Sequence, residues 1–146
     1  MTNALKKNKS LTEITLRSNG LKLPAIIDKN DVSSLRRLTS LDLSYNSFPK
    51  SGAIVLAEFL GTNDTLVSLA LSKCRIGTKS AEVFLPVLKG NTTLLTLDLS
   101  KNSLSDEIAP TIIALLKNNS TLSVLDLREN QSLKTKSGLS TYSIFL

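Results

Sequence analysis

A short pattern of leucines recurs along the chain at an almost constant interval. Each copy starts with a leucine, continues through two aliphatic residues separated by one other residue, and ends in Asn or Cys. Successive copies start 27, 28, 28 and 28 residues apart. This regularity predicts a repeat protein in which each copy forms one structural unit. The copies start at Leu11, Leu38, Leu66, Leu94 and Leu122, and they reach the Asn or Cys at Asn19, Asn46, Cys74, Asn102 and Asn130.

Within each copy, the alternation of aliphatic and other residues predicts a short strand with one buried face. In the second copy we expect Leu41 and Leu43 to face the core and Asp42 to face outward. Because every connection returns to the same edge, we expect parallel strands joined by right-handed crossovers. The Asn that follows each strand has a side-chain amide that can satisfy backbone groups in the bend and in the next coil. Cys74 takes that position in the third copy, so we expect it to be buried and unreactive.

The segments after the strands carry apolar residues at helical spacing. We expect helical stretches within residues 51–60, 78–88 and 105–116, and a weaker helical pattern within 24–37. Pro86 and Pro110 predict a kink or a late helix start. Asn-rich turns follow the helices, and we interpret their Asn-x-Ser/Thr sequences as turns and not as glycosylation sites.

These copies match the template L-x-x-L-x-L-x-x-N/C-x-L, so the chain resembles the leucine-rich repeat proteins. A repeat of about 28 residues with a full helix is similar to the ribonuclease-inhibitor-like class. That class includes ribonuclease inhibitors, the Ran GTPase-activating proteins, the C-terminal region of tropomodulin and the sensor regions of nucleotide-binding immune receptors. The resemblance implies an α/β solenoid, a horseshoe arc with parallel strands on the concave face and helices on the convex face. It indicates the fold strongly and the function weakly.

We expect residues 1–146 to form a single leucine-rich repeat domain of about five repeats that belongs to a longer solenoid. Residues 4–11 resemble the helix end at 114–122, and residues 136–146 resemble a degenerate final helix. Terminal repeats of solenoids need polar caps, and neither end of the sequence shows one.

Composition narrows the classes of partner. The net charge is +6, but Lys and Arg do not cluster strongly along the sequence and no aromatic residues interleave with them, so nucleic-acid binding is not favoured. The N-terminus has no signal peptide, and no stretch approaches the ~20 apolar residues that span a bilayer. With one cysteine and hence no intrachain disulfide, we expect a cytoplasmic or otherwise intracellular protein that does not bind membranes.

Residues suited to catalysis are scarce. The chain has no His and no Gly-rich phosphate loop, and Cys74 has no partner to activate it, so we expect no enzyme activity and no cofactor or metal. Asp42, Asp98 and Asp126 share the outward position of their strands. Adjacent strands lie ~4.8 Å apart, which places Asp98 beside Asp126 and raises the possibility of a metal or acid–base pair. The sequence shows no third ligand, and Leu-Asp-Leu-Ser is a common strand sequence in this class of repeats. We therefore favour a structural role for these aspartates over a metal or catalytic role.

The concave face is the predicted binding surface, because its side chains can vary without disturbing the core. The column after the aspartates reads Arg17, Ser44, Ser72, Ser100 and Arg128, and the next contains Tyr45, Lys73, Lys101 and Glu129. Tyr45 is the candidate anchor, while the lysines either contact a partner or pair with Asp42 or Asp98. The predicted partner-binding residues are Tyr45, Lys73, Lys101, Asp42, Asp98, Asp126 and Arg128.

The leading hypothesis is a non-catalytic protein–protein interaction module or scaffold. An alternative is a GTPase-activating regulator that resembles the Ran GTPase-activating proteins, although the acidic tail of that family is absent. A ribonuclease inhibitor fits less well, because those proteins are acidic and rich in Cys, whereas this chain has a net charge of +6 and one Cys.

Overall fold

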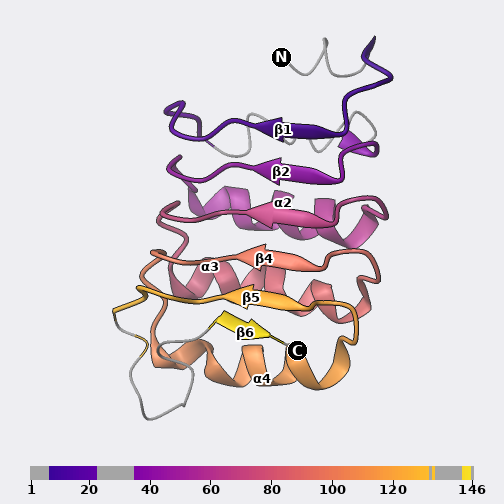
Figure 1. Ribbon diagram of the computed structural model, residues 1–146. Coiled ribbons are helices and arrows are strands. Elements are labelled where there is room, and N and C mark those ends of the chain that lie inside the picture. The colour runs from indigo at the N-terminus through magenta and orange to yellow at the C-terminus, as the bar shows by residue number, and fades with distance from the viewer. Residues whose placement is uncertain (1–6, 23–34, 132, 134–142, 146) are drawn as a thin grey trace.

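The protein is a single stack of strands backed by helices. The computed structural model describes residues 7–22, 35–131, 133 and 143–145. The strands lie side by side in one sheet in chain order, and the described helices cover one face of that sheet (Figure 1). No described helix covers the opposite face, which we call the strand face.

The first five strands are short and parallel. They are β1 (Glu13–Thr15), β2 (Ser40–Asp42), β3 (Ser68–Ala70), β4 (Thr96–Asp98) and β5 (Val124–Asp126). Their register keeps equivalent repeat positions in line, so that the central residues form one column of Ile14, Leu41, Leu69, Leu97 and Leu125. The nearly constant repeat length fixes this register, because a one-residue slip would turn the leucines out of the core. The predicted parallel α/β solenoid is confirmed.

The described helices lie where the apolar spacing predicts them. They are α2 (Lys50–Thr62), α3 (Gly77–Phe84) and α4 (Ala109–Asn118), with 3-10 turns at η2 (Leu85–Gly90) and η3 (Asp106–Ile108). Pro110 falls in the first turn of α4, which agrees with the late helix start predicted there. Pro86 falls in η2, where the 3-10 turn follows α3. Proline lacks the N–H that a helix interior requires. Most of the weaker stretch at 24–37 lies outside the described residues.

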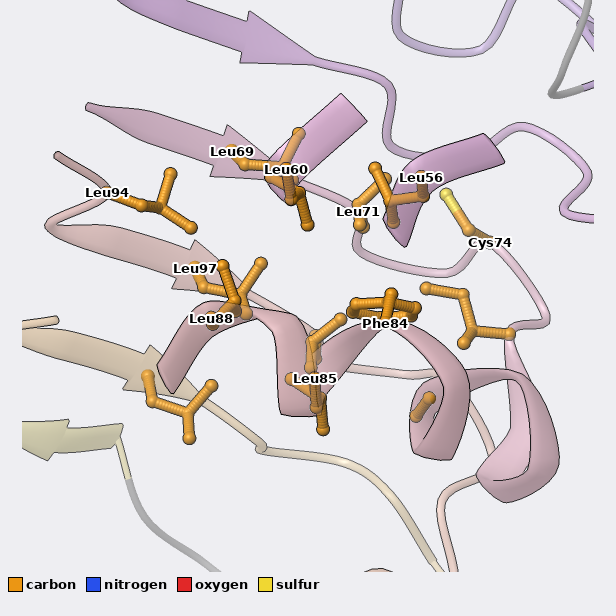
Figure 2. Packing of buried hydrophobic residues seen from close by; sticks show 14 of the residues in the cluster. Leu56, Leu60, Leu69, Leu71, Cys74, Phe84, Leu85, Leu88, Leu94 and Leu97 are labelled. Carbon is orange, nitrogen blue, oxygen red and sulfur yellow. The ribbon is translucent and has the colours of Figure 1, made fainter. Parts of the chain in front are cut away.

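Leucines fill the space between the sheet and the helices. Figure 2 shows Leu88 and Phe84 pointing from the helix layer toward strand residues such as Leu97. All three side chains have almost no exposed surface, and the same apolar cluster runs from Leu35 to Leu133. Each coil therefore packs on its neighbours, as in other solenoids.

Buried asparagines join successive coils just after the strands. The side-chain amide of Asn102 donates to the carbonyls of Leu71 and Ser100 at 2.7 and 3.0 Å. Its oxygen accepts from the backbone N–H groups of Cys74 and Ile76 at 2.9 and 3.3 Å. Asn46 and Asn130 make the same kinds of bonds. These bonds satisfy backbone groups that the core would otherwise leave without partners, so the predicted role is confirmed for Asn46, Asn102 and Asn130. Asn19, in the first copy, is exposed, and its side-chain amide donates to the carbonyl of Arg17 in its own turn.

A second asparagine column connects the turns that follow the helices. In each turn the side-chain oxygen accepts the backbone N–H groups two and three residues later, as for Asn119 with Thr121 and Leu122. The Asn119 amide also donates to the carbonyls of Leu88 and Asn91 in the preceding coil. Asn91 repeats this arrangement, and its amide group is likewise buried. These asparagines therefore build turns, as predicted, and they also bond one coil to the next.

The C-terminal end differs from the expectation. Strand β6 (Ser143–Phe145) pairs antiparallel with β5, so this part of the segment 136–146 is not a degenerate helix; residues 134–142 and 146 lie outside the described part. An extended segment can satisfy the free N–H and C=O groups along the edge of β5, which a helix cannot do. At the other end, the side-chain oxygen of Asn8 accepts the backbone N–H groups of Ser10 and Leu11. This is the turn that follows the helices in later repeats, as the resemblance between 4–11 and 114–122 implied. Residues 1–6 lie outside the described part.

The asparagine column supplies a stability test. Asn102→Ala leaves two buried N–H groups and two carbonyls without their partners, so we expect the free energy of unfolding to fall by about 2–4 kcal/mol. Asn118→Ala is the matched control, because Asn118 is exposed and makes one bond, to the carbonyl of Ala114. Urea denaturation measures both variants. Equal effects of the two substitutions would contradict the role assigned to Asn102.

Candidate functional site

The aspartates of the strand face have a local structural role. One carboxylate oxygen of Asp42 accepts the backbone N–H of Ser44 at 2.8 Å, and Asp98 does the same for Ser100. Asp126 accepts the N–H of Arg128 at 3.0 Å. Side chains that bond to the backbone two residues later stabilise turns. The recurrence of Asp at this position therefore follows from the turn that ends each strand.

The third repeat supports this interpretation, because Ala70 stands where the others have Asp. Here the N–H of Ser72 donates to the hydroxyl of Ser44 in the neighbouring coil at 3.2 Å. The Ser72 and Ser100 hydroxyls are 2.8 Å apart. All three serines are buried, so these three positions of the column bond within the protein and are not open to a partner.

The structure brings two of the three aspartates together. Asp98 and Asp126 are register partners on adjacent strands, as predicted, whereas β3 separates Asp42 from Asp98. Arg128 donates hydrogen bonds to the Asp126 carboxylate, with 3.0 Å from the arginine Nε to each carboxylate oxygen. These hydrogen bonds lower the pKa of Asp126. A general acid needs a raised carboxyl pKa, so this geometry does not favour acid–base work. No group of three or more potential metal ligands occurs among the described residues.

The lysines do not pair as the sequence suggested. Lys101 lies 3.1 Å from the Glu129 carboxylate, and this hydrogen bond raises the pKa of Lys101. Lys73 lies over the ring of Tyr45, with 5.1 Å from its Nζ to the ring centre. The expected pairing of these lysines with Asp42 or Asp98 is therefore wrong. The lysine contacts run within the turn column. All four residues of this column have a positive φ of 54–61°: Tyr45, Lys73, Lys101 and Glu129.

Tyr45 lies in a basic depression that sequence reasoning did not identify. The guanidinium carbon of Arg17 is 4.2 Å from the centre of the Tyr45 ring, and Arg17 also approaches Asp42 to 4.0 Å. The depression has a volume of about 310 Å³ and is lined by Gly20, Lys22, Tyr45, Asn46, Ser47, Lys73 and Arg75. We call it the Tyr45 pocket. The sequence feature that could have identified the pocket is the pair of basic residues Lys73 and Arg75 on either side of Cys74. They occupy the positions that Tyr45 and Ser47 occupy one repeat earlier.

Cys74 takes the asparagine position of the third repeat, as predicted. Its thiol has no exposed surface and donates to the carbonyl of Leu43, with 3.3 Å between sulfur and oxygen. Burial raises the pKa of this thiol, which disfavours the nucleophilic thiolate. Figure 2 shows the side chain among the core residues.

Comparison with known proteins agrees with this architecture. A family profile described as Leucine Rich repeat matches residues 35–57, 62–85 and 90–110. The chain is a leucine-rich repeat protein. Within the described part of this leucine-rich repeat protein, no helix has the length and apolar character needed to cross a membrane. No curated protein sequence matches the chain.

Two solved structures share the fold of this leucine-rich repeat protein. Leiomodin-1 Actin-Binding Site 2 is 22% identical with a TM-score of 0.72, and the match covers 86% of this chain and 76% of that one. The tropomodulin C-terminal domain of Caenorhabditis elegans is 14% identical with a TM-score of 0.67, and the match covers 86% and 79% of the two chains. At these identities the similarity shows the fold.

The Asp126–Arg128 contact predicts a pH dependence. The folded pKa of Asp126 is below its unfolded value, so ionised Asp126 stabilises the fold above the unfolded pKa of about 4, and this contribution is lost as the pH falls through the folded pKa. We expect Asp126→Asn to lower the free energy of unfolding at pH 7, with a difference from the parent that narrows below pH 4. Asp64→Asn removes an exposed carboxylate and serves as control. A difference from the parent that does not depend on pH would contradict this account.

The burial of Cys74 predicts slow chemical labelling. A thiol reagent at pH 8 should modify the folded protein about a hundredfold or more slowly than the protein in urea, because the thiol is enclosed and its thiolate is disfavoured. Absorbance of the released chromophore measures both rates. Similar rates in the two states would show that Cys74 is accessible.

Proposed function

We propose that this leucine-rich repeat protein is a non-catalytic interaction module that binds a partner protein through the strand face. The observation that carries the proposal is the in-register array of outward side chains on that face. Strand and turn backbones hold these side chains, which lowers the entropy lost on binding. The proposed contact residues are Tyr45, Lys73, Lys101, Asp42, Asp98, Asp126 and Arg128.

The two ends of this face have different charge. Toward β5, Arg128 is paired with Asp126 and Lys101 with Glu129, so these groups are neutralised within the protein. Toward β1, Tyr45 and Lys73 belong to the basic Tyr45 pocket. Between them, the half-buried side chains of Ser68, Ala70 and Thr96 are small and leave room for a partner. We therefore assign the main contact to the centre of the face and the Tyr45 pocket.

The size of the face limits what it can do alone. The six strands of the sheet, at ~4.8 Å spacing, span about 24 Å, which is modest against the ~800 Å² that each partner buries in a standard interface. We therefore expect the partner to contact the turns after the strands as well as the strands.

Actin is the first candidate partner. The leiomodin-1 structure that shares the fold is named for an actin-binding site, and this chain covers most of it. Neither of the two solved structures is a GTPase activator or a ribonuclease inhibitor, so those alternatives gain no support. An actin-binding or other adaptor role also agrees with our proposal that the protein is intracellular, as the single free cysteine suggests.

The test is to block the centre of the strand face. The immobilised protein is used to capture partners from native lysate, and each identified partner, together with purified actin, is then tested for direct binding. Thr96→Arg places a large side chain between β3 and β5, and we expect it to weaken partner binding by about tenfold or more. Val83→Arg makes the same type of change on the exposed surface of α3 and should alter affinity by less than about twofold.

Circular dichroism checks that both variants fold. If no protein binds the parent directly, the proposal fails. If Val83→Arg disrupts binding and Thr96→Arg does not, the helix side carries the site instead.

A further inference from the structure

We propose that the Tyr45 pocket binds an acidic segment of the partner protein, with at least two Asp or Glu side chains in the contact. This inference rests on the proposed function and deepens it by naming the chemistry of the partner. It follows from unpaired charge, from the placement of that charge on successive coils, and from the absence of features that other anions use.

The first observation is the charge that the pocket leaves unneutralised. Lys22, Lys73 and Arg75 line the pocket, and in the described part of the chain none of them has a carboxylate within ion-pair distance. The nearby carboxylate is Asp42, which approaches Arg17. Among the described residues, these four cations therefore have one carboxylate within ion-pair distance, that of Asp42. At the other end of the face, the cations are already paired with acidic residues of the protein.

The second observation is the arrangement of these cations in space. Arg17 and Lys22 come from the first coil, Tyr45 from the second, and Lys73 and Arg75 from the third. Coils two positions apart are separated by about 10 Å, and side chains on one face of an extended peptide repeat every ~7 Å. An extended segment that crosses the coils can therefore place carboxylates near cations of both outer coils.

Tyr45 positions the cations as well as lining the pocket. Arg17 and Lys73 reach its ring from the coils on either side, at 4.2 and 5.1 Å from the ring centre. Cation–π contacts restrain two long side chains that would otherwise move freely. Tyr45, Lys73 and Arg75 also have positive φ values of 54–61°, so the local turns fix where these side chains begin. Charges restrained in this way lose less entropy when a ligand binds.

Nucleic acid fits this pocket less well than an acidic peptide. Single-stranded nucleic acids bind through bases stacked on open aromatic rings. Here cations flank the Tyr45 ring from both neighbouring coils, and within residues 35–131 the phenylalanines Phe48, Phe59 and Phe84 are buried in the core. Around the Tyr45 pocket, within residues 7–22 and 35–131, the strand face therefore offers no open stacking platform.

A free phosphate also fits less well. Phosphate sites are usually built from converging backbone N–H groups. In this pocket the N–H of Ser47 donates to the carbonyl of Leu21, and the Asn46 side chain is fully engaged with backbone groups of the first and second coils. The groups that remain for a ligand are side-chain cations spread over several coils, which suit several separate carboxylates.

The experiment is an NMR titration of the ¹⁵N-labelled protein with a peptide of ten glutamates. We expect the largest chemical-shift changes at the amides of Tyr45, Lys73 and Arg75. The double variant K73E/R75E should weaken binding about tenfold or more, because it replaces two attractions by repulsions. The matched control K89E/K117E makes the same change in net charge at exposed helix positions and should alter affinity by less than about twofold.

Further variants separate the contributions and guard against misfolding. K22E changes a cation from the first coil and should weaken binding severalfold even if K73E/R75E fails to fold. Tyr45→Phe keeps the ring and should bind like the parent, whereas Tyr45→Ala should bind more weakly. Peptides of ten glutamines, poly-uridine and tripolyphosphate are the ligand controls, and none should match the glutamate peptide in affinity at these amides.

Several results would overturn the inference. The first is that K22E or a folded K73E/R75E binds the glutamate peptide as tightly as the parent does. The second is that K89E/K117E loses as much affinity as K73E/R75E. The third is that poly-uridine or tripolyphosphate binds at the same amides more tightly than the glutamate peptide. The partner identified through the strand-face test separates the two proposals. If Thr96→Arg disrupts that complex and K73E/R75E does not, the proposed function stands and the acidic-segment inference fails. If neither variant affects it, the proposed function fails as well.

Discussion

The fold depends on satisfying the backbone groups that a tightly coiled chain buries at its turns. Each coil reverses direction at two places, and buried N–H and C=O groups at both need partners. Asn102 supplies four such bonds after its strand, and Asn119 supplies four after its helix. Because each asparagine bonds both its own turn and the adjacent coil, these residues close the turns and hold the coils together.

That constraint also shapes the strand face. Equivalent positions form straight columns because the asparagines and leucines keep all coils in one register. The aspartates then complete the turns that end the strands, and the serines beside them bond to each other or to the next coil. Much of the polar surface is therefore structural, and the side chains open to a partner lie mainly in the turn column that contains Tyr45 and Lys73.

The third repeat shows how substitutions at these positions change the surface. Cys74 replaces the asparagine and Ala70 replaces the aspartate, so this coil has no carboxylate at its strand end. Lys73 and Arg75, on either side of Cys74, are left without acidic partners within the described residues. The basic pocket thus lies where the repeat departs from its own consensus, and these departures distinguish one part of a repetitive face from another.

The sequence by itself determined the repeat boundaries, the strand register, the helix positions and the burial of Cys74, because a regular spacing of leucines and asparagines permits one packing of successive coils. Only the tertiary structure decided which charges pair. Lys101 pairs with Glu129 and Lys73 lies over Tyr45. These contacts join turns of neighbouring coils through long side chains that can reach several partners, and sequence spacing does not select among them. The same holds for β6, whose pairing with β5 satisfies a strand edge that the repeat pattern does not describe.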